Sequence, residues 1–291
     1  MTVLLLGATG MLGRELRQRL AALDLTVVAP GRAELDLVDP AAIRSAVERH
    51  KPTLILNAAA YTAVDKAESE QEQARVLNAE MPGHLAAAAK GAGAHLVHVS
   101  TDYVFPGDAS SPYVEEDATG PLGVYGQTKL DGERAVLAAL PSATIVRTAW
   151  VFGAEGNNFV KTMLRLMKER EQLSVVADQR GRPTAAGDLA DAVLTLGGAV
   201  GGDVQPGVFH FCNADETTWH GFATAILDDA RSKGAELACR SVAPITTADY
   251  PTPAARPAYS VLSTDRFAEA TGSAPRPWRD ALADVLDVLV T

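Results

Sequence analysis

A glycine-rich segment directly after the first apolar run limits what this chain of 291 residues can fold into. The run Val3–Leu6 predicts a buried strand, and Met11–Leu23 carries leucines at helical spacing. Between them stands the sequence Gly7-Ala-Thr-Gly-Met-Leu-Gly13. Glycines at these points let the backbone turn tightly and approach a pyrophosphate, which then binds at the positive end of the helix. The segment therefore predicts a dinucleotide-binding strand–turn–helix unit.

Apolar runs and helical patterns alternate through the first half of the chain, as in a parallel sheet with helices on both faces. Further strands are predicted at Leu25–Ala29, Leu54–Leu56, His95–Ser100 and Thr144–Thr148. Helices are predicted to begin at Asp39-Pro40 and to span about 72–90 and 125–140. After Trp150 the alternation weakens. We predict an α/β, Rossmann-type doubly wound parallel sheet in residues 1–150, with a returning segment near 184–200, and a smaller α/β substrate lobe formed mainly by residues 151–291.

Composition and charge argue against several classes of protein. The formal net charge of −10 disfavours a nucleic-acid binder, which needs a basic face. No apolar stretch approaches the roughly 20 residues of a membrane-spanning helix, and Met1–Leu6 lacks the basic start of a signal peptide. Cys212 and Cys239 are too few for a disulfide scaffold. We therefore expect a cytoplasmic protein with reduced cysteines and no nucleic-acid or membrane partner.

The end of the second predicted strand bears on the choice of nicotinamide cofactor. NAD-binding proteins usually place an acidic residue there, which bonds the ribose hydroxyls. This chain has Gly31-Arg32 instead, and an arginine suits the 2′-phosphate of NADPH. The alternative is an ordinary surface arginine, with which NADH would serve as well. We expect NADPH, with NADH as the alternative cofactor.

Tyr125 and Lys129 indicate the chemistry. Reduction of a ketone needs a hydride donor and an acid that protonates the oxygen, and a free tyrosine, with a pKa of about 10, is a poor catalyst near neutrality. A nearby ammonium lowers that pKa. Four residues apart on a helix, the two side chains share one face. Thr101 follows a strand whose carboxyl end would meet the same crevice. We predict Thr101, Tyr125 and Lys129 as the catalytic set.

Several longer blocks extend these patterns. They are Gly7–Gly13, Asn57–Glu68, Ser100–Phe105, Tyr125–Lys129, Arg147–Phe152, Asn157–Met163 and Pro251–Pro257. In these blocks, which spread over nearly the whole chain, the protein resembles the dTDP-4-dehydrorhamnose reductases, a family of extended short-chain dehydrogenases. The resemblance implies the last step of dTDP-L-rhamnose synthesis, the reduction of dTDP-4-dehydro-L-rhamnose. Hydride from NAD(P)H would reach C4 of this nucleotide sugar while Tyr125 protonates the C4 oxygen.

The resemblance also implies the cofactor contacts. Gly7, Gly10, Met11, Leu12 and Gly13 would line the pyrophosphate, Asp36 and Leu37 would flank the adenine, and Ala60, Tyr61 and Thr62 would lie along the nicotinamide half. Lys129 would hold the nicotinamide ribose and lower the pKa of Tyr125. Asp36 could instead start the turn before Asp39-Pro40, and Tyr61 and Thr62 could simply end the third strand.

For the substrate, the resemblance implies contacts from Thr101, Asp102 and Tyr103, with Trp150 covering the sugar and Asn158 nearby. Arg180, Arg182 and above all Arg256 would bind the diphosphate, because a guanidinium suits phosphate oxygens. Each residue also has a purely structural alternative. Trp150 could be a core aromatic, Asp102 a turn cap and Asn158 a helix cap, and the arginines could be surface residues.

Three other functions compete with reduction of this ketosugar. Related 4,6-dehydratases follow the active-site threonine with Asp-Glu, whereas this chain has Asp102-Tyr103, so the eliminating base is missing. A non-catalytic NADP-binding regulatory subunit would not need the complete Thr101, Tyr125 and Lys129 set. A sister reductase of another dTDP-4-ketosugar, such as dihydrostreptose synthase, stays open.

The oligomeric state is left open as monomer or homodimer. Some members of the family form a Mg²⁺-bridged dimer through acidic residues, and Glu15 and Asp188 lie in the corresponding stretches. Asp188 stands where glutamate is expected, and neither residue has metal-ligand spacing of its own. The sequence therefore argues against Mg²⁺ as a cofactor.

Overall fold

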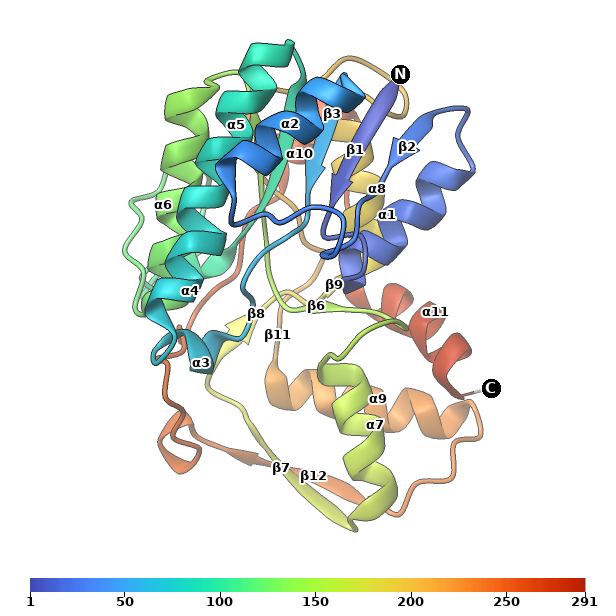
Figure 1. The fold of residues 1–291 in the computed structure, drawn as a ribbon. Coiled ribbons are helices and arrows are strands. Elements are labelled where there is room, and N and C mark those ends of the chain that lie inside the picture. The colour runs from blue at the N-terminus through green and yellow to red at the C-terminus, as the bar shows by residue number, and fades with distance from the viewer. Residues whose placement is uncertain (291) are drawn as a thin grey trace.

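A six-stranded parallel sheet forms the centre of the protein, a computed structural model in which residues 1–290 are described (Figure 1). Its order is β10 (Gly207–His210), β5 (Thr144–Thr148), β4 (His95–Thr101), β3 (Leu54–Asn57), β1 (Thr2–Leu6) and β2 (Thr26–Val28). Every neighbouring pair is parallel. The chain passes from β1 to β2 on one side and returns as β3 on the other, which creates a switch point where ligands bind. The predicted doubly wound sheet is confirmed.

Successive residues of the strands bury opposite faces of this sheet. Val3 and Leu5 pack against α1 (Met11–Ala21), α8 (Ala186–Leu196) and α10 (Asp265–Thr271). Leu4 and Leu6 pack against α2 (Pro40–His50), α5 (Met81–Ala92) and α6 (Val124–Ala139). Near-continuous apolar strands are what two covered faces require. Besides α8, the strand β10 and the helix α10 also return to the sheet, so more of the later chain packs there than the segment near 184–200.

The other elements lie beyond the carboxyl ends of the strands, in the lower half of Figure 1. They include α7 (Phe159–Glu169), α9 (Trp219–Ser232), α11 (Trp278–Val290) and the parallel pair β7 (Gln172–Val176) and β12 (Ser241–Ile245). Their apolar core, with Phe152, Phe222 and Trp278, shares no residue with the clusters on the sheet. Short strands join the two parts, namely β6 (Val151–Phe152) with β9 (Thr184–Ala185) and β8 (Arg180–Gly181) with β11 (Thr217–Thr218). Within residues 1–290, none of the helices has the length and apolar character needed to cross a membrane.

The helix predicted at about 72–90 differs from expectation, because a π-helical turn divides it. The structure has α4 (Gln71–Arg75), the π turn η1 (Val76–Glu80) and then α5, and a short helix α3 (Val64–Ala67) precedes them. In the π turn the buried Asn78 accepts the Tyr61 N–H at 2.8 Å and donates to the Tyr61 carbonyl at 3.0 Å. Apolar periodicity does not reveal such a turn. Its effect is to fix the backbone of the segment that follows β3.

The helix α6 packs unusually closely on its neighbours, and two glycines make this contact possible. A Cβ at Gly126 would lie 2.2 Å from the Tyr103 carbonyl oxygen in the short 3-10 helix η2 (Asp102–Val104), and one at Gly132 would lie 2.0 Å from the Asn78 carbonyl oxygen. At the start of the helix, the Val124 N–H donates to Glu68 Oε1 at 2.9 Å. These contacts fix α6 along its length.

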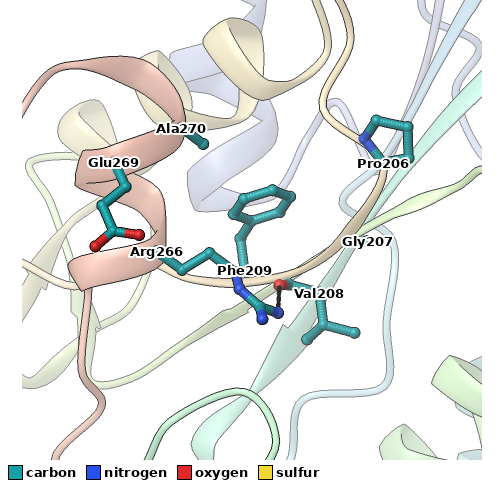
Figure 2. A pocket seen from close by; sticks show the side chains of 7 residues that line it. All are labelled: Pro206, Gly207, Val208, Phe209, Arg266, Glu269 and Ala270. Atoms are coloured by element: carbon teal, nitrogen blue, oxygen red, sulfur yellow. Dashed lines mark hydrogen bonds between the residues drawn. The ribbon is translucent and has the colours of Figure 1, made fainter.

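The free edge of β10 is covered by a charged side chain. Arg266 of α10 donates from Nη1 to the Val208 carbonyl oxygen at 3.2 Å (Figure 2). The same side chain also pairs with Glu116. A hollow of about 390 Å³ lies there, lined by Pro206, Gly207, Val208, Phe209, Arg266, Glu269 and Ala270. Charged groups on edge strands prevent pairing with another chain. The hollow adjoins the amino end of β10, away from the carboxyl ends of the strands.

The close packing of α6 generates a prediction on stability. Gly132→Ala places a methyl group against backbone, so α6 must move, and we expect a loss of about 1–3 kcal/mol of unfolding free energy. Gly91→Ala in α5 is the matched control, because its Cβ would meet no atom within 4 Å. That variant should gain about 0.5–1 kcal/mol from helix propensity. Denaturant unfolding of both variants measures this, and equal effects would contradict the steric explanation.

Candidate functional site

A cleft of about 980 Å³ opens at the carboxyl ends of the sheet strands. The glycine segment, the loop after β2, the segment after β3 and the ends of β4 and β5 line one part of it, and Trp150, Gly156, Asn157 and Trp219 line another. Both parts of the fold therefore contribute to it. A cleft of this size is at the upper end for small-molecule sites.

The glycine segment brings the start of α1 to the floor of the cleft. Gly7 has a positive φ of 78°, and a Cβ there would lie 2.6 Å from the Ala58 backbone. A Cβ at Gly13 would lie 2.1 Å from the Gly7 carbonyl oxygen. Gly10 precedes the helix without a side-chain cap, so the N–H groups of the first turn, at Met11 and Leu12, face the cleft unopposed by a side chain. This arrangement suits an anionic pyrophosphate.

The loop after β2 lines the next part of the cleft. Arg32, Asp36 and Leu37 all belong to its lining. Arg32 is exposed, while the neighbouring Gly31 N–H donates to Glu34 Oε2 at 2.7 Å. Asp36 Oδ1 accepts the Val38 N–H at 2.9 Å, so this residue also stabilises its own turn. The arginine is thus the cationic side chain that this loop presents to the cleft.

After β3 the chain contributes Ala60 and Thr62 to the cleft, but Tyr61 is absent from the lining. The Tyr61 backbone is bonded to Asn78, and its hydroxyl donates to Glu70 at the surface. This hydrogen bond raises the pKa of Tyr61 to about 12. The structure therefore turns Tyr61 away from the position expected along the nicotinamide.

Thr101, Tyr125 and Lys129 meet in the cleft, as their spacing predicted. Thr101 ends β4, and Tyr125 lies in the first turn of α6, half-buried. The Tyr125 ring packs edge-on against Tyr103, with ring centroids 5.5 Å apart. Burial raises the pKa of Tyr125 to about 12, although the hydroxyl of Thr101 opposes this rise. The phenol therefore holds its proton at neutral pH.

Lys129 is 2% exposed, and its amine is bonded to β4. Its Nζ donates to the Val99 carbonyl oxygen at 2.7 Å and lies 3.3 Å from His98 Nε2. Burial lowers the pKa of Lys129 to about 8, and Glu133 one turn along α6 opposes this change. The amine does not lower the pKa of Tyr125 in this arrangement, which differs from what the resemblance implied.

Buried polar atoms without partners gather beside Tyr125. Within residues 1–290, Ser100 Oγ, Asp102 Oδ2 and Thr148 Oγ1 have no hydrogen-bond partner, and all three residues line the cleft. Asp102 accepts the Thr101 hydroxyl at 2.9 Å through its other oxygen. Burial raises the pKa of Asp102 to about 6. Since unsatisfied buried polar groups are rare, this cluster points to a polar ligand.

Two tryptophans form a stacked pair at the other side of the cleft. Trp150 and Trp219 lie 3.7 Å apart between ring centroids with an interplanar angle of 12°. Trp150 has a positive φ of 48°, and Gly181 makes room for its ring, because a Cβ there would lie 2.5 Å from it. Trp219 was not predicted. Its place at the start of α9, after the capping Thr218, is visible in the sequence, but its contact with Trp150 is not.

Asn158 and Arg256 do not line the cleft. Asn158 caps α7 by accepting the Lys161 N–H at 3.2 Å, and its neighbour Asn157 reaches the cleft instead. Arg256 is bonded to Asp65 at 2.8 Å. In this structure Asn158 thus serves as a helix cap and Arg256 as the partner of Asp65, and their expected contacts with the substrate stay predictions.

The other two arginines considered for a diphosphate differ from each other. Arg180 forms an ion pair with Glu216. Arg182 donates from Nη1 to the Leu262 carbonyl oxygen at 2.9 Å, and its buried Nε has no partner within the described part of the chain. Of these two arginines, Arg182 therefore has a buried Nε–H group that could bond a ligand.

The carboxylates considered for Mg²⁺ are already paired with arginines. Glu15 accepts from Arg19 at 2.6 Å, and Asp188 accepts from Arg276 at 2.9 Å and from Asn213 at 2.6 Å. No group of three or more His, Cys, Asp or Glu side chains that could hold a metal occurs among residues 1–290. In this structure both carboxylates are therefore bonded to arginines, and the role of Mg²⁺ stays a prediction.

Comparisons with known proteins agree with this geometry. The family model described as RmlD substrate binding domain matches residues 1–291. The "dTDP-4-dehydrorhamnose reductase" of Streptomyces griseus is 47% identical over 98% of this chain and 93% of its own. The "Probable dTDP-4,6-dihydroxy-2-methyloxan-3-one 4-ketoreductase" of Streptomyces antibioticus is also 47% identical, over 98% of this chain and 95% of its own.

A solved structure agrees over the same length. The Bacillus anthracis dTDP-4-dehydrorhamnose reductase in complex with NADP has a TM-score of 0.91 and 36% identity, and the match covers 98% of each chain. The resemblance drawn from the sequence blocks is thus confirmed. The chain belongs to the dTDP-4-dehydrorhamnose reductase family.

Proposed function

We propose that this protein reduces dTDP-4-dehydro-L-rhamnose to dTDP-L-rhamnose with NADPH. The observation that carries the proposal is the position of Tyr125, which lies in one cleft with the glycine turn and with the unpartnered polar atoms of Ser100, Asp102 and Thr148. An acid is thus placed between a site for a dinucleotide and a site for a polar ligand. The names of the relatives support this substrate and this cofactor.

The cofactor would be held at the switch point of the sheet. The first turn of α1 would bind the pyrophosphate, and Arg32 would pair with the 2′-phosphate at the far end of the cleft. Ala60, Thr62 and Lys129 would line the nicotinamide half. When bound, NADPH supplies the hydride that reduces the ketone carbon.

Tyr125 would protonate the oxygen that the reduction makes negative. Its pKa of about 12 means that the phenol keeps its proton until an alkoxide, which is a much stronger base than water, forms beside it. Thr101 would hydrogen-bond the same oxygen and orient the ketone. Asp102 and Ser100 would bond hydroxyl groups of the sugar, and the stacked Trp150 and Trp219 would cover its apolar face.

The residue after Asp102 favours reduction over elimination. Elimination needs a base next to the ketone, and Tyr103 occupies that position in the sequence. Burial raises the pKa of Tyr103 well above its usual range, and the charge of Asp102 adds a smaller rise. A phenol that holds its proton so firmly does not serve as the base of a dehydratase.

A second substrate is favoured by one finding. The Streptomyces antibioticus relative has the same 47% identity as the Streptomyces griseus reductase but is named for a different dTDP-ketosugar. A spectrophotometric assay with each ketosugar and NADPH distinguishes the two functions. Oxidation of NADPH with dTDP-4-dehydro-L-rhamnose at the higher kcat/KM supports the proposal, and oxidation with the other sugar alone contradicts it.

Three further expectations stay predictions. They are a cytoplasmic location, a monomeric or homodimeric state, and reduced Cys212 and Cys239, which are both buried. The ion pairs of Glu15 and Asp188 argue against a role for Mg²⁺ in joining subunits.

Tyr125→Phe tests the proton donor. The variant keeps the ring but cannot protonate the alkoxide, so kcat should fall by at least a factor of about 100, the size of a general-acid contribution. NADPH binding, followed by fluorescence titration, should stay within about twofold. Turnover near that of the wild type would contradict the assigned role.

Arg32→Ala tests the preference for NADPH. Loss of a guanidinium–phosphate pair should weaken NADPH binding by about 1.5–3 kcal/mol and leave NADH binding nearly unchanged. Arg17→Ala on α1 is the control, because Arg17 is exposed and does not line the cleft. Equal weakening of NADPH and NADH would remove the argument for the 2′-phosphate.

Asp102→Asn tests whether this carboxyl binds the substrate at a cost to the stability of the folded protein. In the folded protein the pKa of Asp102 rises from 3.8 to about 6, so stability falls as the pH increases through this interval, because the folded state binds the proton more tightly. The variant should therefore be more stable than the wild type above about pH 6, by on the order of 1–3 kcal/mol, with no such gain below about pH 4. Unfolding free energies measured across this range provide the test, together with the KM for the ketosugar, which should rise. A variant less stable than the wild type at pH 7 would contradict the explanation.

A further inference from the structure

A buried hydrogen-bonded row leads from the end of β3 to the amine of Lys129. The Ala59 N–H donates to Asn57 Oδ1 at 3.1 Å, Asn57 Nδ2 lies 2.9 Å from His98 Nδ1, and His98 Nε2 lies 3.3 Å from Lys129 Nζ. Asn57, His98 and Lys129 are at most 2% exposed. His98 does not line the cleft, so it can influence a ligand only through Lys129.

The direction of each hydrogen bond in this row follows from its first member. The Ala59 N–H can only donate, so the Asn57 amide must present its oxygen to Ala59 and its NH₂ group to His98. An NH₂ group can only donate, so His98 Nδ1 must accept and carries no proton. Burial lowers the pKa of His98 well below its usual range, so the ring is neutral. Its single proton therefore lies on Nε2, facing Lys129.

This tautomer determines which form of Lys129 fits. An ammonium has three donors and no acceptor, so it would oppose the His98 Nε2–H. A neutral amine accepts that proton with its lone pair and still donates to the Val99 carbonyl oxygen at 2.7 Å. Burial already brings the pKa of Lys129 to about 8, and the imidazole donor favours the neutral form further.

The charged groups around Lys129 do not reverse this preference. Along α6 the neighbours are Tyr125, whose phenol is protonated, and Glu133, which is bonded twice to Arg147 of β5, at 2.7 Å and 3.0 Å. Titratable groups also occur on the other elements that contact α6. They are His95 and His98 on β4, Asp102 and Tyr103 on η2, Asp65 and Lys66 on α3 with Glu68 directly after it, Glu72 and Arg75 on α4, Glu80 on η1, and His84 and Lys90 on α5. Glu133 raises the pKa of Lys129, but its charge is shared with Arg147.

We propose that His98 is a positioning residue that holds Lys129 against β4 as a neutral amine in the ligand-free protein. Protonation of the amine breaks its contact with His98 Nε2–H and frees the resulting ammonium to turn toward the cleft. There it would line the nicotinamide half of the cofactor, the role that the proposed function gives it. The proposal rests on that function for this last step alone.

The tautomer of His98 can be measured directly. Two-bond ¹H–¹⁵N correlation spectra of the ligand-free protein, labelled with ¹⁵N-histidine, should show His98 as the neutral Nε2–H tautomer at pH 7, assigned by its absence in His98→Gln. In Asn57→Asp, whose second oxygen can only accept, the same ring should change to the Nδ1–H tautomer. An Nδ1–H tautomer or an imidazolium in the wild type would overturn the proposal.

The ionisation of Lys129 provides a second readout. The ¹³Cε chemical shift of Lys129 in the ligand-free protein, labelled with ¹³C-lysine and followed by NMR from pH 6 to 10, reports the fraction of neutral amine. We expect a midpoint below pH 8 in the wild type. In His98→Gln the midpoint should rise by about one pH unit, because the glutamine amide can turn its oxygen toward the ammonium. At a pH below the midpoint, this rise reduces the fraction of neutral amine about tenfold.

His210→Gln is the matched control for damage to packing. His210 is also a fully buried histidine on a sheet strand, β10, but its ring is bonded to the Tyr113 carbonyl and lies beside Arg147 rather than Lys129. This variant should leave the Lys129 midpoint where it is in the wild type. An unchanged midpoint in His98→Gln, or the same rise in both variants, would overturn the proposal. Neither measurement involves turnover, so a failure of the proposed reaction would be seen separately.

Discussion

The contact of α6 with the carboxyl end of β4 is the constraint on which the rest of the site depends. The helix is held close by Gly126, which meets the backbone of η2 directly after β4, and by Gly132, which meets the backbone of η1. Lys129 of α6 bonds the Val99 carbonyl of β4 at 2.7 Å. Tyr125 is one turn away on the same helix, so its phenol can reach only the space beside Thr101. A larger residue at either glycine would move Tyr125, the proposed proton donor, relative to the strand that carries Thr101. The chemistry thus depends on how closely two backbones approach.

The cleft has a cost in stability that a bound ligand would remove. Asp102, Ser100 and Thr148 each bury an oxygen that has no partner among residues 1–290, and an unsatisfied buried group costs about 1–3 kcal/mol. Buried charges outside the cleft are paired instead, as where Arg147 and Glu133 form an ion pair at 2.7 Å and the arginine also stacks over Phe105. Hydroxyl groups of a bound sugar could supply the hydrogen bonds that these buried oxygens lack.

Local patterns predicted most of what lies close together along the chain. The strand, the glycine turn and the start of α1 are adjacent in sequence, and the Tyr125–Lys129 spacing is set by one helical turn, so both could be inferred from the residues alone. The π turn at Asn78 could not, because it changes no apolar period, and it is the reason why Tyr61 points toward Glu70. Contacts between distant segments were also hidden. Trp219 meets Trp150 across 69 positions of sequence, Asp65 takes Arg256 as its partner, and His98 determines the surroundings of Lys129.

In the proposed reaction, hydride passes from NADPH to the ketone carbon of a dTDP-4-ketosugar held beside Tyr125. Incubation of the enzyme with dTDP-4-dehydro-L-rhamnose and NADPH deuterated on the transferred face tests it most directly. We expect one deuterium in the product, located at C4 of the sugar by NMR and mass spectrometry. A product without deuterium at C4, or a consumed substrate that has lost water instead of gaining hydride, would contradict it.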